Sequence, residues 1–296
     1  LHVGTDIGGS VRLPATHGGF FALKPSLGRV PTHPPFLGRV AGPMTRTVMD
    51  SALLMGPLTG PDIRDFMSLP HQPVDHARKL GKLKMKGLRI GLMREMGVGL
   101  RPHPLVAKAV GECAAALAAA GAAVEEANSF LTADMLEGMC RFFEARSHND
   151  VMAMDEERRA KILPFVLEWA TWRAGAFSGR HVMAAYNQVH AMREAAVLTV
   201  AKYDFVLSPT SPILPYAAEL PSPNNDPHDA LPHIAFTVAY NMSEQPAASI
   251  NWSFTPEGMP VGVQVVGQRF DDLGVLRLSR AIEKMRPKQP PWPQPA

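Results

Sequence analysis

The sequence predicts an α/β fold, in which helices cover both faces of a mixed β-sheet. Residues 88–93 form a short apolar run typical of a buried strand. The segment that starts at Pro104 carries apolar residues at helical spacing and stops at Gly121, which predicts a helix. Val124 then lies in a second strand. A strand–helix–strand unit of this length favours parallel pairing of the two strands and therefore an α/β architecture.

For the first 84 residues the sequence predicts mainly loops, with one helix. Residues 1–44 are dense in glycine and proline, which predicts a functional loop with short extended pieces. The stretch Thr47-Val-Met-Asp50 has the form of a capping box, so a helix is expected from there to Met55, with Gly56-Pro57 as its stop. Residues 60–84 are polar and interrupted by prolines, and they are interpreted as a surface connection.

The second half of the chain supplies further helices and strands. Residues 131–202 are predicted to be mostly helical in about three segments, the last of them capped by Ser178. The remaining expected elements are a strand at 204–208, a helix near 233–242, strands around 247–251 and 261–266, and a closing helix at 271–285. No linker divides the sequence, so a single domain over residues 1–296 is expected.

Composition bounds the possible functions. Hydrophobic residues make up 46% of the 296 residues and charged residues 19%, as in ordinary globular proteins. The formal charge is +3 without a basic run, so neither nucleic acid nor a membrane surface is an expected partner. No apolar stretch approaches the roughly 20 residues of a spanning helix. The two cysteines, Cys113 and Cys140, show no pairing or metal spacing, and the expected location is the cytoplasm.

The chemical signal lies in Gly4-Thr-Asp-Ile-Gly-Gly-Ser-Val-Arg-Leu-Pro-Ala15. A hydrolase that acts on acyl compounds needs an exposed hydroxyl and N–H donors aimed at the developing oxyanion. The two glycines before Ser10 allow a tight turn with unobstructed N–H groups. A Gly-Gly-Ser string is also common in ordinary turns that contain a structural serine, so its spacing alone leaves both interpretations open.

Other motifs with similar composition do not fit. A nucleophile elbow needs glycine two residues after the serine, where Arg12 stands. The Gly-Lys-Ser/Thr string of a phosphate-binding loop does not occur, and no histidine pair has zinc spacing, so no hydrolytic metal is expected. A Ser-His-Asp triad stays open, because composition selects none of the 11 histidines for it.

Five ordered blocks of the sequence resemble the amidase-signature enzymes, a family that includes bacterial amidases, fatty acid amide hydrolase and the A subunit of glutamyl-tRNA amidotransferase. The block Gly4–Ala15 is similar to the second half of the family signature, and this match is highly specific. The others are 23–31, 42–50 together with 60–62, 203–210 and 258–267. The resemblance covers nearly the whole chain and implies the amidase-signature fold.

The resemblance also implies a chemistry. In the family a neutral lysine takes up a proton through a second serine, held by a cis peptide, and thereby activates the nucleophilic serine. Ser10 falls on the position of that nucleophile, and Asp6 and Arg12 match polar residues that support its loop. The backbone N–H groups of three residues fall on the oxyanion-hole positions: Ile7, Gly8 and Gly9.

The lysine and the second serine of that triad have no counterpart in this sequence. In the family both lie upstream of the serine motif, and this chain opens with that motif at Leu1. Lys24 belongs to a Leu-Lys-Pro block and is interpreted as structural. We therefore expect an N-terminal part of the fold to be missing from residues 1–296, and we expect these residues alone to be inactive.

Aromatic residues in the helical middle region allow two interpretations. Phe165, Trp169 and Trp172 have the spacing of one helix face. Together with Phe142 and Phe143 they are typical of core packing, and they are also typical of an apolar ligand pocket. The resemblance implies that this region sets substrate choice, but the residues name no substrate.

By resemblance, then, the expected activity is hydrolysis of a small-molecule carboxamide through an acyl-enzyme on Ser10. No metal, nucleotide or organic cofactor is implied, and a homodimer is left open. One alternative is the A subunit of a tRNA-dependent amidotransferase, a glutaminase that works with a partner subunit. That subfamily usually places glutamine directly after the arginine of the serine motif, where this chain has Leu13. The other alternative is a non-catalytic protein with the same fold.

Overall fold

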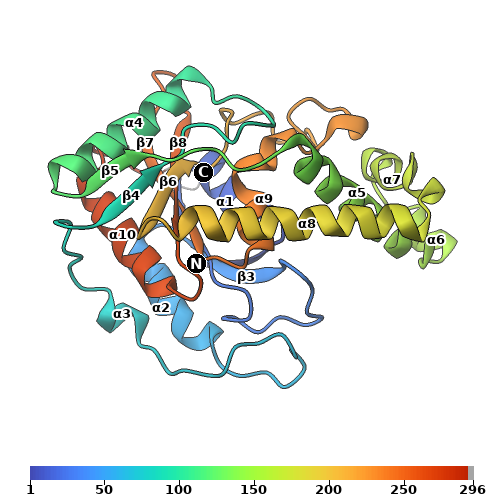
Figure 1. Ribbon diagram of the computed structural model, residues 1–296, viewed down its shortest axis with the longest axis horizontal. Helices are drawn as coiled ribbons and strands as arrows, with labels where there is room; N and C mark the ends of the chain where they lie inside the picture. The colour runs from blue at the N-terminus through green and yellow to red at the C-terminus, as the bar shows by residue number, and fades with distance from the viewer. Residues whose placement is uncertain (293–296) are drawn as a thin grey trace.

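The computed structural model describes residues 1–292, which are organised around one mixed sheet of eight strands in the order β1-β3-β2-β7-β8-β6-β4-β5 (Figure 1). The strands are β1 (His2–Asp6), β2 (Phe21–Lys24), β3 (Val40–Thr45), β4 (Arg89–Leu92), β5 (Ala123–Glu126), β6 (Phe205–Pro209), β7 (Ala247–Phe254) and β8 (Pro260–Gly267). Strand β4 pairs in parallel with β5 and β6, and the other neighbours are antiparallel. The predicted mixed α/β fold is confirmed.

The predicted strand–helix–strand unit consists of β4, α4 (Pro104–Ala119) and β5. The apolar side chains of α4 that recur at helical spacing are buried, among them Val106, Cys113 and Leu117. Gly121, where the helix was expected to stop, has φ of +103° in the turn toward β5. The pairing of β4 with β5 is parallel, as this unit predicts.

Helices cover both faces of the sheet, because side chains along each strand alternate between the faces. On one face α2 (Val48–Leu58), α4 and α10 (Asp272–Met285) enclose a core that contains Phe205 and Leu207 of β6. Val206, between them, points into a second core on the other face. That second core is covered by α5 (Ala133–Met152), α8 (Gly179–Val200) and α9 (Ala235–Met242).

The helical middle region extends beyond the sheet, to the right in Figure 1. Helices α6 (Glu156–Arg159) and α7 (Pro164–Thr171) and the short 3-10 turn Ala174–Ala176 lie between α5 and α8. The predicted cap of the last helix is present: the N–H of His181 donates to Ser178 Oγ over 3.3 Å, and the N–H of Ser178 donates to His181 Nδ1. None of the helices in residues 1–292 is long and apolar enough to cross a bilayer.

Two expectations about the first 84 residues were incomplete. The short extended pieces expected in residues 1–44 are strands, and their pairing along β3 satisfies backbone groups despite the glycines and prolines, whereas the helix α1 (Arg12–Gly18) was not expected. Helix α2 does not stop at Gly56-Pro57 but runs to Leu58. Pro57 lies in its last turn, where the missing N–H costs a single bond, and Thr59 N–H still donates to Met55 O over 3.1 Å.

Candidate active site

The segment that carries Ser10, here called the serine turn, is the tight turn of residues 7–11 between the end of β1 and the start of α1. Gly9 has φ of +136°, a conformation that side chains rarely adopt. The N–H of Leu13 donates to Gly9 O over 2.7 Å, so helical winding begins directly after this residue. Ser10 is exposed at the outer start of α1, whereas Val11 and Arg12 are buried. The turn therefore exposes the hydroxyl of Ser10 to solvent, while the two residues that follow it are buried.

Helix α9 packs against the same turn through Thr237. Thr237 Oγ1 donates to Gly8 O over 2.5 Å. A Cβ added to Gly9 would lie 2.5 Å from Thr237 Oγ1 and 2.8 Å from Leu13 Cδ1, distances too short for real contacts. Glycine at this position is required both by the backbone conformation and by the packing of α9.

A buried ion pair joins the two ends of the turn. Arg12 Nε lies 3.0 Å from Asp6 Oδ2, and both side chains are withdrawn from solvent. The Asp6 carboxylate also accepts the N–H of Gly9 over 2.7 Å and the N–H of Val11 over 3.3 Å. Burial opposes ionisation of Asp6, but the charge of Arg12 and the hydrogen bonds from Arg12 and Asn241 outweigh it and lower the pKa of Asp6.

Arg12 uses all five of its N–H donors. Besides the two bonds to Asp6, its guanidinium donates to Thr237 O over 3.0 Å, to Gln264 Oε1 over 2.9 Å and to Asn241 Oδ1 over 2.5 Å. These acceptors come from α9 and from the central strand β8. The planar guanidinium thus fixes the serine turn against two elements that lie more than two hundred residues further along the chain.

The side-chain amides of Asn241 and Gln264 are also fully hydrogen-bonded. Asn241 Nδ2 donates to Asp6 Oδ1 over 2.8 Å and to Gly38 O over 3.0 Å. Gln264 Nε2 donates to Phe236 O over 2.7 Å and to Ser208 Oγ over 3.1 Å. Residues Asn241, Gln264 and Thr237 were not singled out from the sequence. The signal was present in part, since a lone amide in an apolar strand or helix must find partners when buried.

The exposed side of the turn carries N–H groups that have no partner in residues 1–292. Within residues 1–292, the N–H groups of Ile7, Gly8 and Ser10 have no hydrogen-bond acceptor. The N–H of Gly9, by contrast, is the donor to Asp6. The role of Ile7, Gly8 and Gly9 in holding an oxyanion stays a prediction.

Lys24 lies at the end of β2 and is completely buried. Its Nζ donates to Pro25 O over 3.0 Å, and in residues 1–292 no hydrogen bond connects it to Ser10. Burial and the nearby charge of Arg12 lower the pKa of Lys24 to about 7, although the carboxylates of Asp6, Asp272 and Glu244 act in the opposite direction. Lys24 is therefore buried close enough to Asp6 and Arg12 for their charges to act on it, whereas Ser10 is exposed.

The aromatic residues of the middle region were expected either to pack in the core or to line a ligand pocket. Phe142 and Phe143 of α5 belong to the second core, and Phe143 lies close to Gly8, with its Cε2 3.7 Å from where a Cβ of Gly8 would be. On α7, Trp169 packs against that core, whereas Trp172 at the helix end is 41% exposed. Of this set, Phe143 is the one placed beside the serine turn.

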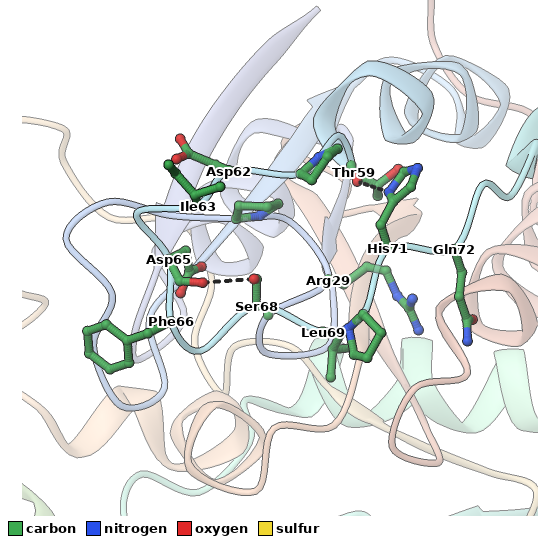
Figure 2. A pocket seen from close by; sticks show the side chains of 14 residues that line it. Arg29, Thr59, Asp62, Ile63, Asp65, Phe66, Ser68, Leu69, His71 and Gln72 are labelled. Carbon is green, nitrogen blue, oxygen red and sulfur yellow. Dashed lines mark hydrogen bonds between the residues drawn. The ribbon is translucent and has the colours of Figure 1, made fainter.

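A cavity of about 550 Å³ lies elsewhere, between the loops around Arg29 and residues 59–72 (Figure 2). Its walls are tied together by Asp65, whose carboxylate accepts the N–H groups of Thr32 and Met67, each over 2.8 Å. Arg29 is already paired with Asp272 at 3.0 Å. None of the residues of the serine turn lines this cavity, and its charged side chains, Arg29, Asp62 and Asp65, are each bonded to other groups of the protein. Among residues 1–292, no group of three or more His, Cys, Asp or Glu side chains is arranged to hold a metal ion.

The model of the amidase family matches residues 1–276 of this sequence. The chain belongs to the amidase family. Among curated relatives of this family, it is 31% identical to the A subunit of the glutamyl-tRNA(Gln) amidotransferase from Myxococcus xanthus, over 95% of this chain and 63% of that protein. It is 28% identical to the corresponding protein from Thermodesulfovibrio yellowstonii, over 96% of this chain and 63% of that protein. The chain thus spans somewhat less than two thirds of the length of these relatives.

Solved amidase-family structures share the fold. A bacterial aryl acylamidase of the amidase-signature family superposes with a TM-score of 0.83 at 29% identity, over 96% of this chain and 61% of that one. The 6-aminohexanoate cyclic dimer hydrolase in complex with its substrate gives a TM-score of 0.81 at 25% identity, over 97% and 64%. These matches confirm the predicted amidase-signature fold.

Replacement of Arg12 by leucine is expected to lower the free energy of unfolding by about 3–5 kcal/mol, because it leaves the Asp6 carboxylate buried without a counter-charge. Arg12→Lys keeps the charge but offers three donors in place of five, so it should still be clearly destabilised. Urea denaturation measures both. The matched control is Arg158→Gln, which breaks an exposed ion pair with Asp155 and should cost less than about 1 kcal/mol. Equal stability of the Arg12 and Arg158 variants would contradict the proposed dependence on this pair.

The low pKa of Lys24 predicts a particular pH dependence of stability. The folded state releases the proton near pH 7, whereas the unfolded chain keeps it until pH 10.5, so between these values the unfolded state binds more protons. Stability should therefore rise with pH, by roughly 2 kcal/mol between pH 7 and pH 9 from this group. Urea denaturation at several pH values should show a shallower rise for Lys24→Met than for the wild type. Parallel curves would mean that Lys24 keeps its proton when folded.

Proposed function

We propose that this chain carries the nucleophile of an amidohydrolase, which cleaves the C–N bond of a small-molecule carboxamide through an acyl-enzyme on Ser10. The observation that carries the proposal is the serine turn itself. Ser10 is exposed, the adjacent N–H groups of Ile7 and Gly8 are without acceptors in residues 1–292, and the turn is fixed from below by the Asp6–Arg12 pair. Membership of the amidase family supports the same chemistry.

In the proposed reaction Ser10 Oγ attacks the amide carbonyl carbon, and its proton passes to a base. The carbonyl oxygen becomes an oxyanion, which the free N–H groups of the turn stabilise. The C–N bond breaks as the nitrogen takes up a proton, and the amine leaves. Water then attacks the ester of Ser10, so that the carboxylic acid is released and the hydroxyl is restored. Preorganisation is the contribution of Asp6 and Arg12, because a rigid turn need not reorder when charge develops.

The base for this reaction is proposed to be the lysine and second serine that the family resemblance implies. No position of this sequence matches either of them, and in residues 1–292 no side chain forms a hydrogen bond with Ser10 Oγ. Lys24 does not fill the role, because it is buried and bonded to Pro25 O. The inactivity of residues 1–296 alone follows from this proposal and stays a prediction.

The substrate is proposed to be a small amide. The aryl acylamidase and the 6-aminohexanoate cyclic dimer hydrolase are named for amide substrates of different shape, so they indicate the bond that is cleaved and not the group beside it. A simple aryl amide is the natural first assay. The cytoplasm is the proposed location, since both cysteines are free thiols, and a homodimer is left open.

A second candidate function is that of an amidotransferase A subunit. The curated relatives named above favour it, because they carry that name at 28–31% identity. Leu13 argues against it, since glutamine is usual there in that subfamily. The two candidates differ in a direct assay. Release of ammonia from glutamine that requires ATP and a partner protein would favour the amidotransferase, and hydrolysis of aryl amides by the protein alone would favour the amidase.

Ser10→Ala, made in the protein expressed from its complete coding sequence, is expected to lower turnover of an aryl amide by several orders of magnitude while leaving the melting temperature unchanged. The reason is that only a hydroxyl at this position can form the acyl-enzyme. A serine-directed fluorophosphonate should add once to the wild type, on the peptide that contains Ser10. The matched control is Ser129→Ala, which changes another exposed serine, one outside the helices and strands, and should keep both turnover and melting temperature. An active Ser10→Ala enzyme, or an adduct on a different serine, would remove Ser10 from the mechanism.

Gly9→Ala, made in the protein expressed from its complete coding sequence, should lower turnover by on the order of 10²–10³, because the added Cβ collides with Thr237 and Leu13 and displaces the N–H donors of the turn. Gly111→Ala is the matched control, since its Cβ would meet nothing closer than an atom of Arg94 at 3.6 Å. That control should keep turnover and gain slightly in stability, because Gly111 is in the interior of α4. Steady-state kinetics and thermal melts on both variants test this. Normal turnover by folded Gly9→Ala would show that the turn tolerates a side chain.

A further inference from the structure

A cavity of about 310 Å³ lies at the end of α1 opposite Ser10, and the proposed function does not use it. Three parts of the chain enclose it: the C-terminal end of α1, the β7–β8 hairpin and the segment that follows α10. Its volume is at the lower end of the range of small-molecule sites, about 300–1,000 Å³. The lining residues that matter here are His17, Gly19, Phe254, Pro260, Arg286 and Trp292.

The wall formed by the segment after α10 is fastened to β7 by specific bonds. A register shift between Asn251 and Ser253 interrupts the pairing of β7 with β8. Trp252 O, at this irregularity, accepts Gln289 Nε2 over 3.1 Å. Asn251 Nδ2 donates to Gln289 Oε1 over 2.6 Å, and Arg286 donates to Asn251 O over 3.0 Å. The cavity is therefore bounded by an ordered wall.

The charge at this cavity is unbalanced. Within residues 1–292, Arg286 forms no ion pair, and its one hydrogen bond goes to a backbone carbonyl. Burial lowers the pKa of Arg286, but an arginine starts so high that it stays charged at neutral pH. The charge of Glu283, on α10, acts on it, yet Glu283 is already paired with Arg280 and accepts the N–H of Val48.

The other titratable groups near the cavity do not compensate this cation. Arg46 lies over the ring of Trp292, 5.0 Å from its centroid, and adds a second positive charge at the rim. Burial lowers the pKa of His17 to about 4, so it is neutral at pH 7. Glu257, in the β7–β8 turn, is exposed and bonded to Thr255. The local field favours an anion.

The rest of the lining is flat and apolar. Phe254 and Trp292 contribute aromatic rings, and Pro260, Pro290 and Pro291 contribute rigid surfaces. Gly19, in the left-handed conformation with φ of +72°, lets Phe254 and Pro260 approach the end of α1 closely. Walls of this kind suit a planar ring, and the half-buried guanidinium of Arg286 suits a carboxylate, which it can bind with two parallel hydrogen bonds.

We propose that this cavity is a binding site for a small aromatic monocarboxylate, with the carboxylate on Arg286 and the ring between Phe254 and Trp292. The site is separate from the serine turn. Helix α1 connects the two, since Ser10 precedes its first turn and His17 lies in its last. The proposal does not depend on the amidohydrolase activity, because it concerns binding to residues that the reaction does not use.

The first test compares three single-ring compounds on the protein expressed from its complete coding sequence, by isothermal titration calorimetry: benzoate, neutral benzamide and cationic benzylamine. Benzoate should bind roughly 10- to 100-fold more tightly than benzamide, the range expected for hydrogen bonds to a charged group, and benzylamine should not bind. Equal binding of benzoate and benzamide, or preference for benzylamine, would overturn the proposal.

The second test uses variants matched in charge. Arg286→Gln should abolish the preference for benzoate, whereas Lys288→Gln removes a positive charge from the same segment without touching the cavity lining and should keep it. Loss of affinity in both variants to the same degree would mean that only net charge attracts the ligand, which contradicts a built site. Thermal melts check that Arg286→Gln remains folded.

The third test places the ligand. Benzoate should change the fluorescence of Trp292, so the signal should vanish in Trp292→Phe and persist in Trp169→Phe, which alters a tryptophan outside this cavity. This readout separates the site from the serine turn, where a carboxylate product of amide hydrolysis would also bind. Persistence of the full signal in Trp292→Phe would show that benzoate binds elsewhere and would overturn the proposal.

Discussion

The interaction on which the site depends is the buried ion pair between Asp6 and Arg12. Two charges withdrawn from water cost several kcal/mol each unless their remaining bonding capacity is met, and here it is met. The guanidinium reaches the last residue of β1, the backbone and an amide of α9, and an amide of β8. Because these elements must already be assembled for the pair to be satisfied, the serine turn takes its shape only in the finished fold.

The protonation of Lys24 depends on the same two charges. Asp6 carries one negative charge, and Arg12 alone neutralises it at contact distance. A protonated Lys24 would place a second cation in the same buried region with a single carbonyl as its partner. Release of its proton is the less costly state, which is the direction of its pKa. The core can therefore hold a lysine here without an ion pair of its own.

Local pattern allowed most of the fold to be predicted, and contacts distant in sequence account for what was missed. Helix α4 and the strands around it follow from apolar spacing, and the cap of α8 follows from Ser178. Strands β1 and β3 were expected only as short extended pieces of a loop, because their glycines and prolines favour loops in isolation, and only the pairing of Gly4 with Gly42 and its neighbours makes them strands.

The same division holds at the site. Asp6 and Arg12 could be named because they lie within a few residues of Ser10 in a familiar motif. Thr237, Asn241 and Gln264 could not, since their relation to the turn exists only after α9 and β8 pack against it. Gln264 illustrates this, because it stands between two valines in an apolar strand. A polar side chain at such a buried position needs a hydrogen-bond partner from another element, and here that partner is the carbonyl of Phe236.

The position of β1 at the edge of the sheet has a bearing on how this protein would lose its site. Within residues 1–292 the strand is paired on one side, by β3, and most of its side chains face solvent, whereas β7 and β8 are paired on both sides and buried. Segments with few buried contacts open at a lower free energy than the centre of the domain. Fraying of β1 would carry Asp6 away from Arg12 while the central strands stay intact. In residues 1–292, distortion of the serine turn on mild heating would then come before loss of secondary structure, so a melting curve would overstate the temperature range in which Ser10 is correctly positioned.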